Sequence, residues 1–232
     1  MKTYRFLLFD ADGTLLDFDR DMEMAFSRTY ETCFSAQRTF APELLDCYEQ
    51  CNDKWWKKLE RGECTKPELV VARFREFLER TGLKGDPAAI NETYFANLGQ
   101  GGALFPGALE LIRDLSQNYE LYIVTNGNAV TQKTRLKHSG LMDYVKAYFV
   151  SEDAGAAKPD PRYFQYVFSR IPDFSREEAL LLGDSLTSDM LGAKNAGLDR
   201  LWYNPQGIPA PEELAITYQV RCFSEIRQLL LP

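Results

Sequence analysis

Short, almost continuous apolar runs alternate with amphipathic stretches over much of this chain, and this alternation constrains its fold more than any other feature. The runs are RFLLF before Asp10, YELYIV before Thr125, AYFV before Ser151, ALLLG before Asp184 and RLWY before Asn204. Runs that are apolar throughout suit parallel strands that are buried on both faces. Because helical patterns lie between them, the sequence predicts an α/β fold with a doubly wound, Rossmann-like parallel sheet.

The segment from residue 17 to residue 99 breaks this alternation. It contains no convincing strand pattern, but it contains four amphipathic helical patterns with short connections, which favour an antiparallel bundle. Pro67 and Pro87 lie where the last two helices are expected to begin, a position at which the missing N–H of proline costs nothing. We therefore expect a core formed by residues 1–16 and 100–232, with an inserted four-helix bundle formed by residues 17–99.

Composition and charge exclude several functional classes. With 45% hydrophobic and 26% charged residues, the chain has the composition of an ordinary globular protein. A net charge of −7 and a pI of about 5.0 oppose non-specific attraction to nucleic acid or anionic lipid. No apolar run approaches the roughly 18 residues of a membrane span. We expect a cytoplasmic monomer or small homo-oligomer that binds neither a nucleic-acid polymer nor a membrane.

Cysteine and histidine usage points away from other kinds of site. The five cysteines form no CxxC pair, and their odd number argues against a full disulfide framework. The single histidine, His138, would have to carry a His-rich metal site or a conventional Ser-His-Asp triad alone. The candidate chemistry therefore lies with the carboxylates.

Polar residues follow several of the predicted strands at their carboxyl ends. Asp10, Thr125 and Asp184 each end a different strand run. Lys158 follows a further strand after a short loop, and Asp189 lies five residues after Asp184. Ligands bind beyond the carboxyl ends of the strands in open α/β sheets. We therefore expect these five side chains to lie together on one rim.

The charges on this rim predict a metal ion. The carboxylates expected there are Asp10, Asp12, Asp184 and Asp189. With Lys158 as the only compensating cation, such close like charges would force protonation or push the rim apart. A hard divalent cation resolves the conflict, and Mg²⁺ prefers oxygen ligands. The pattern predicts a magnesium site that accepts a dianionic phosphate together with Lys158 and the hydroxyl of Thr125.

Four short motifs occur in an order and at spacings that resemble those of the haloacid dehalogenase superfamily. They are DADGT (Asp10 to Thr14), VTNG (Val124 to Gly127), KPDP (Lys158 to Pro161) and GDSLTSD (Gly183 to Asp189). Each motif is weak alone, whereas the ordered set is highly specific. The resemblance covers essentially the whole core, and the inserted helices are similar to the type 1 cap of that family.

The resemblance implies a Mg²⁺-dependent phosphatase that acts on a small phosphomonoester through an aspartyl-phosphate intermediate. It implies that Asp10 is the nucleophile and that Asp12 is the general acid and base. The implied Mg²⁺ ligands are the carboxylates of Asp10 and Asp184 and the backbone carbonyl of Asp12. Thr125 and Lys158 match the groups that hold the phosphoryl oxygens and stabilise charge during transfer.

Two further residues match supporting positions of the family. Asn126 would help to orient the phosphate, together with backbone N–H groups of the first two motifs. Asp189 would orient Lys158 or a metal-bound water, and whether it contacts the metal directly stays open. Asp12 also distinguishes phosphatases from dehalogenases within the family, because the dehalogenases of the family lack an aspartate two residues after the nucleophile. Its presence here favours phosphoryl chemistry.

The residues in two of the motifs narrow the class of substrate that the resemblance implies. DADGTLLDFD and GDSLTSD are most similar to the branch of 5′-nucleotidases that act on nucleoside monophosphates. Two alternatives stay open: a phosphomutase of the beta-phosphoglucomutase type, which uses the same four motifs, and a non-catalytic module that binds a phosphorylated ligand. The sequence does not give the natural substrate, because selectivity lies in cap side chains whose orientation it leaves open.

Overall fold

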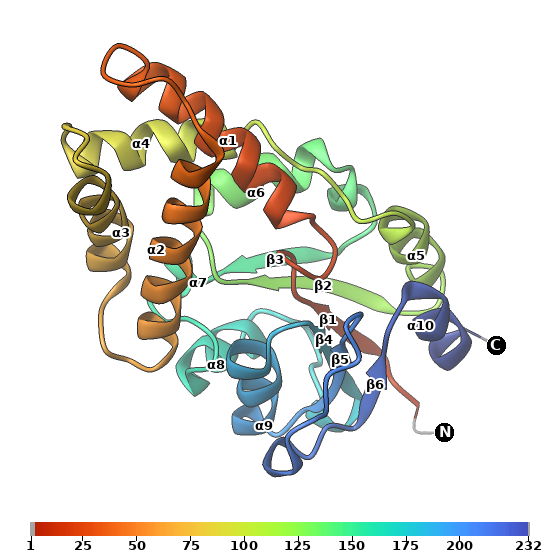
Figure 1. Ribbon diagram of the computed structural model, residues 1–232. Coiled ribbons are helices and arrows are strands. Elements are labelled where there is room, and N and C mark those ends of the chain that lie inside the picture. Colours follow the sequence, from red (N-terminus) through yellow and green to blue (C-terminus); the bar gives the residue numbers. More distant parts are fainter. Residues whose placement is uncertain (1–2, 232) are drawn as a thin grey trace. The chain divides into compact units, whose positions relative to one another are not determined.

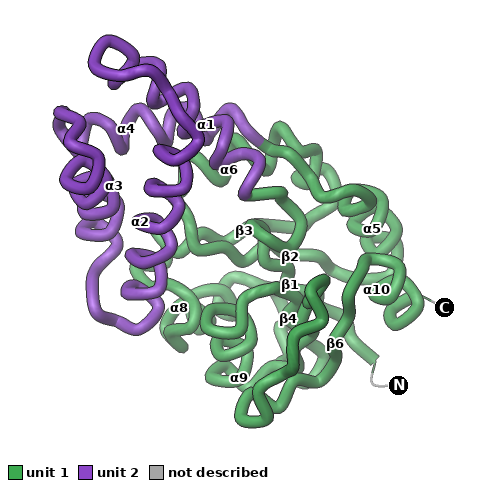
Figure 2. Tube along the Cα trace, in the orientation of Figure 1, with its two compact units in different colours: residues 1–18, 102–232 green, residues 19–101 purple. Residues whose placement is uncertain are grey.

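The computed structural model describes residues 3–231. The chain divides into two compact units (Figure 2). Unit 1 comprises residues 1–18 and 102–232, and unit 2 comprises residues 19–101. Both divisions fall two residues later than the boundaries expected from the sequence.

Local contacts on each side account for the later boundaries. The backbone N–H of Asp17 donates to the carbonyl of Ala103 at 2.9 Å. The guanidinium carbon of Arg135 lies 5.7 Å from the centre of the Phe18 ring. Asp17 and Phe18 thus contact residues of unit 1, whereas the backbone N–H groups of residues 100 and 101 donate to carbonyls of Asn97 and Leu98 in unit 2.

The segments that lead to and from unit 2 pair with each other. Leu16 and Leu104 form an isolated antiparallel bridge, and the backbone N–H of Phe105 donates to the carbonyl of Leu15 at 3.0 Å. The entry and the exit of the insertion therefore run side by side within unit 1.

Unit 1 is built on a six-stranded parallel sheet with the strand order β3-β2-β1-β4-β5-β6 (Figure 1). The strands are β1 (Phe6–Phe9), β2 (Glu120–Thr125), β3 (Ala147–Val150), β4 (Ala179–Gly183), β5 (Asp199–Tyr203) and β6 (Tyr218–Val220). Because the order reverses at β1, the sheet is doubly wound. The predicted α/β fold is confirmed.

The register of the strands determines which residues lie together at the carboxyl edge of the sheet. Phe9, the last residue of β1, pairs with Ile123 of β2 on one side and with Leu182 of β4 on the other. The carboxyl ends of these three strands therefore lie within two residues of one another, because β2 ends at Thr125 and β4 at Gly183. Asp10 and the residues at the ends of β2 and β4 reach the same edge.

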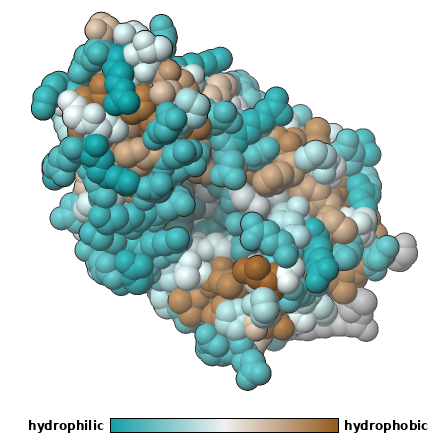
Figure 3. All heavy atoms as spheres, viewed as in Figure 1, coloured by the Kyte–Doolittle hydropathy of each residue, from teal (hydrophilic) through white to brown (hydrophobic). Residues whose placement is uncertain are grey.

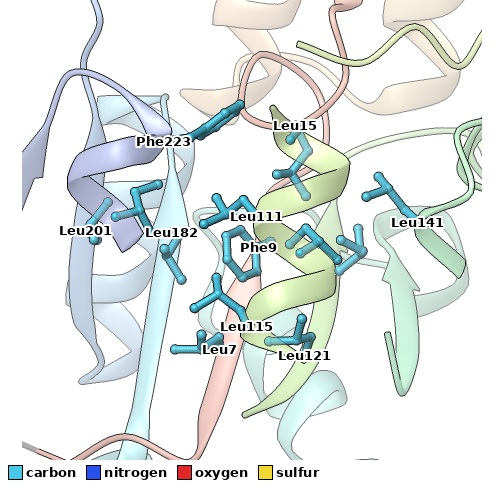
Figure 4. Packing of buried hydrophobic residues seen from close by; sticks show 14 of the residues in the cluster. Leu7, Phe9, Leu15, Leu111, Leu115, Leu121, Leu141, Leu182, Leu201 and Phe223 are labelled. Atoms are coloured by element: carbon cyan, nitrogen blue, oxygen red, sulfur yellow. The ribbon is translucent and has the colours of Figure 1, made fainter. Parts of the chain in front are cut away.

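Helices cover both faces of the sheet. One face packs against α5 (Ala108–Leu115), α6 (Ala129–His138) and α10 (Phe223–Leu230), and the other packs against α8 (Pro161–Phe168) and α9 (Leu191–Ala196). Successive side chains of a strand point to opposite faces, so the apolar residues of β1 serve two clusters. Leu7 and Phe9 belong to the first cluster, and Phe6 and Leu8 to the second. Figure 4 shows Leu111 of α5 beside Phe9 in the first cluster.

Several elements were not expected from the sequence. Strand β6 has three residues and no continuous apolar run, and α10 follows it directly. The remaining short elements are α7 (Ser151–Ala154), a π-helical turn (Leu186–Met190) and 3₁₀ turns at Leu141–Asp143, Arg176–Glu178 and Glu212–Leu214. Of these, the π-helical turn bears on the site because it carries Asp189.

Four helices account for most of the segment that contains unit 2. They are α1 (Phe18–Phe34), α2 (Pro42–Glu60), α3 (Lys66–Thr81) and α4 (Pro87–Leu98). Pro67 and Pro87 lie in the first turns of α3 and α4, as expected. Thr65 and Glu68 form a capping box before α3, and the Asp86 side chain caps α4.

Within residues 3–231, no helix combines the length and the apolar character that crossing a membrane requires. On the face seen in Figure 3, most of the visible surface is hydrophilic.

Candidate active site

Three carboxylates meet at the edge of the sheet where β1 and β4 end. One oxygen from each of Asp10, Asp184 and Asp189 lies within 4.8 Å of the other two. Asp10 follows β1 directly, and its backbone N–H donates to the carbonyl of Leu182 at 2.8 Å. Asp184 follows β4, and its carbonyl accepts from the indole N–H of Trp202 at 2.7 Å. The ends of neighbouring parallel strands thus hold this cluster together.

Asp189 reaches the cluster from the π-helical turn. The backbone N–H of Ser185 donates to Asp189 Oδ2 at 3.1 Å, which closes the turn on itself. A Cβ atom on Gly183 would lie 2.4 Å from Asp189 Cγ. The absence of a side chain at the end of β4 therefore lets the Asp189 carboxylate lie against the strand.

Lys158 is the buried cation of this cluster, with 2% of its surface exposed. Its ammonium donates to Asp10 Oδ1 and Asp189 Oδ1, each at 2.6 Å, and to the carbonyl of Val124 at 2.8 Å. These three acceptors use all three of its donors. Burial alone would lower the pKa of Lys158, but the Asp10 and Asp189 charges outweigh it and hold that pKa above its ordinary value.

The cluster carries an excess of negative charge. Three carboxylates and one ammonium leave a net charge of −2 when all are ionised. Burial, followed by the charge of Asp189, raises the pKa of Asp10 well above its ordinary value despite Lys158. The same two causes raise the pKa of Asp184 to about 7. A divalent cation would remove the conflict, and this all-oxygen donor set fits a hard ion such as Mg²⁺.

Thr14 connects two of the carboxylates, a role that sequence reasoning missed. Its hydroxyl lies 3.3 Å from Asp10 Oδ2 and 3.1 Å from Asp184 Oδ1. The loop reaches this geometry through Gly13, whose φ is +83° and whose Cβ atom would lie 2.7 Å from Asp184 Oδ2. The available signal was the hydroxyl in the first motif, four residues after Asp10.

Asp12 has partners different from those expected. Its Oδ1 accepts from Arg135 Nη1 at 2.5 Å, and its Oδ2 accepts from Gln132 Nε2 at 2.8 Å. Lys158 is therefore not the only compensating cation, and that expectation is wrong. The four carboxylates divide into a cluster of three around Lys158 and one that is paired with a fully buried arginine.

Thr125 and Asn126 follow each other at the end of β2 and have different contacts. The Thr125 hydroxyl accepts from Gln132 Nε2 at 2.7 Å. Asn126 Oδ1 accepts from the backbone N–H of Lys158 at 2.8 Å, and its Nδ2 donates to the carbonyl of Lys158 at 2.9 Å. Both ends of the Asn126 amide thus position the loop that carries Lys158.

The predicted site residues therefore form two hydrogen-bonded groups, which the chain joins between Thr125 and Asn126. Asp10, Asp184, Asp189 and Lys158 make the central cluster. Asp12 and Thr125 are joined through Gln132, and Asn126 is joined to Lys158 through its backbone. Sequence reasoning missed Thr14, Gln132 and Arg135, of which the last two lie on a helix whose polar composition hides its buried face.

Residues 4–197 match the family described as haloacid dehalogenase-like hydrolase. The chain is 41% identical over 230 residues to the HAD-hydrolase YfnB of Bacillus subtilis, covering 99% of this chain and 97% of that protein. It is 36% identical over 228 residues to the pyrimidine 5′-nucleotidase PynA of Streptococcus pneumoniae, covering 98% and 95%. It is 33% identical over 224 residues to the pyrimidine 5′-nucleotidase YjjG of Escherichia coli, covering 97% and 96%.

A solved structure agrees with these relatives. The crystal structure of YfnB bound to magnesium superimposes with a TM-score of 0.93 at 41% identity, covering 100% of both chains. The family match, the relatives and this structure confirm the resemblance carried by the four motifs. The chain belongs to the haloacid dehalogenase-like hydrolase family.

Proposed function

We propose that this protein is a Mg²⁺-dependent phosphatase that hydrolyses small phosphomonoesters, with pyrimidine nucleoside 5′-monophosphates as its substrates. The observation that carries the proposal is the convergence of Asp10, Asp184, Asp189 and Lys158 beyond the carboxyl ends of the adjacent strands β1 and β4. The similarity to two pyrimidine 5′-nucleotidases supports the substrate class.

In the proposed reaction, Asp10 is the nucleophile. One of its carboxylate oxygens attacks the phosphorus, and the bond from phosphorus to the ester oxygen breaks. Asp12 gives a proton to the departing oxygen, so the alcohol leaves neutral. Asp12 then takes a proton from water, which attacks the phosphorus of the aspartyl-phosphate and releases inorganic phosphate together with a free Asp10.

The surrounding residues hold charge in place during this transfer. Lys158 is fixed by Asp10 and Asp189, so its ammonium is oriented before the substrate arrives. Together with the Thr125 hydroxyl, it would bind phosphoryl oxygens. Held by the carboxylates of Asp10 and Asp184 and the carbonyl of Asp12, Mg²⁺ would supply positive charge that offsets both the anionic cluster and the phosphate.

A phosphate-release assay with and without EDTA tests the proposal. Pyrimidine and purine nucleoside monophosphates and sugar phosphates are compared, and uridine and cytidine monophosphates are expected to be the best substrates. Sugar phosphates that turn over far better than any nucleotide would contradict the substrate class. Phosphate release that lags behind substrate loss would indicate a phosphomutase, and binding without turnover would indicate a non-catalytic module.

Replacing the nucleophile separates its role from that of the fold. Asp10→Asn is expected to lower kcat by about 10⁴-fold or more, because the step that needs a carboxylate oxygen is lost. Asp143→Asn, which removes an exposed carboxylate from a 3₁₀ turn, is the control and is expected to keep full activity. Retained turnover in Asp10→Asn would exclude Asp10 as the nucleophile.

Magnesium binding can be measured without a substrate. At 100 times its Kd, the ion is expected to raise the free energy of unfolding by about 2.7 kcal/mol, because it binds only the folded site. Asp184→Asn removes one of the proposed ligands and should abolish most of that gain. Thermal unfolding with a titration of MgCl₂ gives the answer, and an equal gain in both proteins would contradict the proposed site.

A further inference from the structure

We propose that Gln132 and Arg135 are positioning residues that orient the Asp12 carboxylate for proton transfer, and that Gln132 also orients the hydroxyl of Thr125. This inference rests on the proposed function, in which Asp12 exchanges a proton with the leaving group and with water. It assigns a purpose to two polar side chains of α6 that are both buried in unit 1.

Each oxygen of the Asp12 carboxylate has its own donor. Arg135 Nη1 lies 2.5 Å from Oδ1, and Gln132 Nε2 lies 2.8 Å from Oδ2. A carboxylate held at both oxygens cannot rotate about its Cβ–Cγ bond without breaking a hydrogen bond, and one of these bonds is charge-assisted. The Asp12 side chain is nevertheless 25% exposed, so its orientation is fixed while it stays accessible.

The amide of Gln132 has one orientation that satisfies all of its neighbours. Its Nε2 donates to Asp12 Oδ2 and to Thr125 Oγ1, and its Oε1 accepts from Arg135 Nη1 at 2.9 Å. The reversed amide would place its oxygen against a carboxylate oxygen and its hydrogens against a guanidinium. Arg135 therefore fixes Gln132, which in turn fixes Asp12.

The same amide leaves Thr125 ready to donate. Because Thr125 Oγ1 accepts the hydrogen of Gln132 Nε2, its own hydrogen is available for a different acceptor, such as a phosphoryl oxygen. One glutamine thus links the residue that would exchange protons to the residue that would bind the phosphate.

The local backbone is built to place Gln132 and Arg135. The two residues are three apart on α6, so their side chains lie on one face of the helix. The helix begins at a defined residue, because Asn128 Oδ1 accepts from the backbone N–H of Thr131 at 3.0 Å. A Cβ atom on Gly127 would lie 2.4 Å from Gln132 Cγ, so the glycine leaves room for the glutamine.

Charge adds a second effect to orientation. When Asp12 passes its proton to the leaving oxygen, negative charge develops on a carboxylate that already accepts two hydrogen bonds. Donors that are in place before the charge appears need no rearrangement during the reaction. The fully buried guanidinium of Arg135 meets that condition.

The leaving group of the substrate provides the test. An alkyl phosphate needs a proton on its departing oxygen, whereas p-nitrophenyl phosphate releases a stable nitrophenolate that needs none. We compare kcat/KM, which covers the steps through the first phosphoryl transfer, on p-nitrophenyl phosphate and on uridine monophosphate or whichever alkyl phosphate the wild-type protein hydrolyses best. The variants are Arg135→Lys and Gln132→Leu.

Both variants are expected to lose about 10²-fold on the alkyl phosphate, the cost of a catalytic group that is displaced by about 1 Å. The loss on p-nitrophenyl phosphate is expected to be about tenfold smaller. Lys137→Met removes an exposed cation from the same helix and is the control. It should leave both values unchanged.

A double-variant cycle identifies the residue through which the effect acts. In an Asp12→Asn background, Arg135→Lys should produce no further loss on the alkyl phosphate, because the group that it positions is already gone. If Arg135→Lys does not fold, as judged by circular dichroism, Gln132→Leu carries the same test, since it keeps the pair of Arg135 and Asp12.

Three outcomes would overturn the inference. Equal losses on both substrates would show a structural role or a direct role in phosphate binding. Fully additive losses in the Asp12→Asn background would show that the two residues act independently of Asp12, whereas a partial loss in Gln132→Leu alone is expected from its contact with Thr125. Faster turnover in either variant would show that the contacts hold Asp12 away from the reaction. By contrast, a wild-type protein that releases no phosphate from any ester would contradict the proposed function itself.

Discussion

Both units of this protein bury cations, and Lys158 of unit 1 and Arg73 of unit 2 are stabilised in different ways. Lys158 of unit 1 is 2% exposed and donates to two carboxylates, those of Asp10 and Asp189. Arg73 of unit 2 is 1% exposed and donates to two neutral amide oxygens, at 2.7 Å and 2.9 Å. Among residues 3–231, no carboxylate pairs with Arg73.

Aromatic rings take the place of carboxylates around Arg73. Its guanidinium carbon lies between 4.8 and 5.9 Å from the ring centres of Tyr48, Phe74, Tyr94 and Phe95. The faces of such rings carry partial negative charge that attracts a cation. The amide oxygens come from Asn52 of α2 and Asn91 of α4, so Arg73 of α3 connects three helices.

The difference in surroundings suits Lys158 to a binding site and Arg73 to a structural role. The carboxylates around Lys158 leave an excess of negative charge, which a further cation can neutralise. That cation can in turn attract an incoming phosphate. The rings and amides around Arg73 leave no net charge beyond that of the arginine. We expect the first arrangement to respond to ions and the second to stay indifferent to them.

Removing Lys158 gives the largest expected change in stability. Lys158→Met leaves two buried carboxylates without their cation and should lower the free energy of unfolding by about 3–5 kcal/mol. Part of this loss should return when MgCl₂ is added, because the ion replaces some of the missing positive charge. Urea unfolding with and without Mg²⁺ measures both effects. Lys146→Met, at an exposed lysine, is the control, and a loss that magnesium leaves unchanged would break the comparison.

Removing Arg73 should have a smaller effect. Arg73→Met leaves the oxygens of Asn52 and Asn91 without a donor, at an expected cost of about 2 kcal/mol. No buried charge is left behind, so added Mg²⁺ should not reduce the difference between this variant and the wild type. The same urea titrations measure it. A cost as large as that of Lys158→Met would show that rings and amides stabilise a buried cation as strongly as carboxylates do.

The smallest effect is expected at the end of β4. The Cβ atom introduced by Gly183→Ala would overlap the Asp189 carboxylate and must push it aside, at a cost of about 1–2 kcal/mol. The displaced carboxylate would weaken the hydrogen bond between Lys158 and Asp189. The melting temperature should therefore depend more strongly on Mg²⁺ than in the wild type. Thermal unfolding and a magnesium titration are the measurements. An unchanged melting temperature would mean that Asp189 has room to move without loss.

Sequence reasoning works for the strand ends because geometry leaves little choice there. Parallel strands in register bring the residues after them to one edge, so the sequence alone predicts the places of Asp10, Thr125 and Asp184. Lys158 and Asp189 could be placed on the same rim, because Lys158 follows a further strand run after a short loop and Asp189 lies five residues after Asp184. Strand β6 escaped detection because three residues make too short a pattern.

The same reasoning fails for side chains whose partners are far away in the chain. Arg135 lies in AVTQKTRLKH, a mostly polar helix whose buried face composition does not reveal, and its partner Asp12 is more than a hundred residues away. Arg73 lies in LVVARFREF, where an arginine is expected to face solvent. Burial of either cation depends on tertiary partners, and local periodicity contains no record of them.

The pairing of the segments around Leu16 and Leu104 has a consequence for the engineering of this protein. Because the two ends of the insertion are adjacent in unit 1, the sheet has to accommodate the insertion at one place only. We therefore expect that the helical segment can be lengthened or exchanged for that of a relative while the site residues at the end of the sheet keep their geometry. The hydrogen bond between the backbones of Asp17 and Ala103 marks the position at which such an exchange would be made.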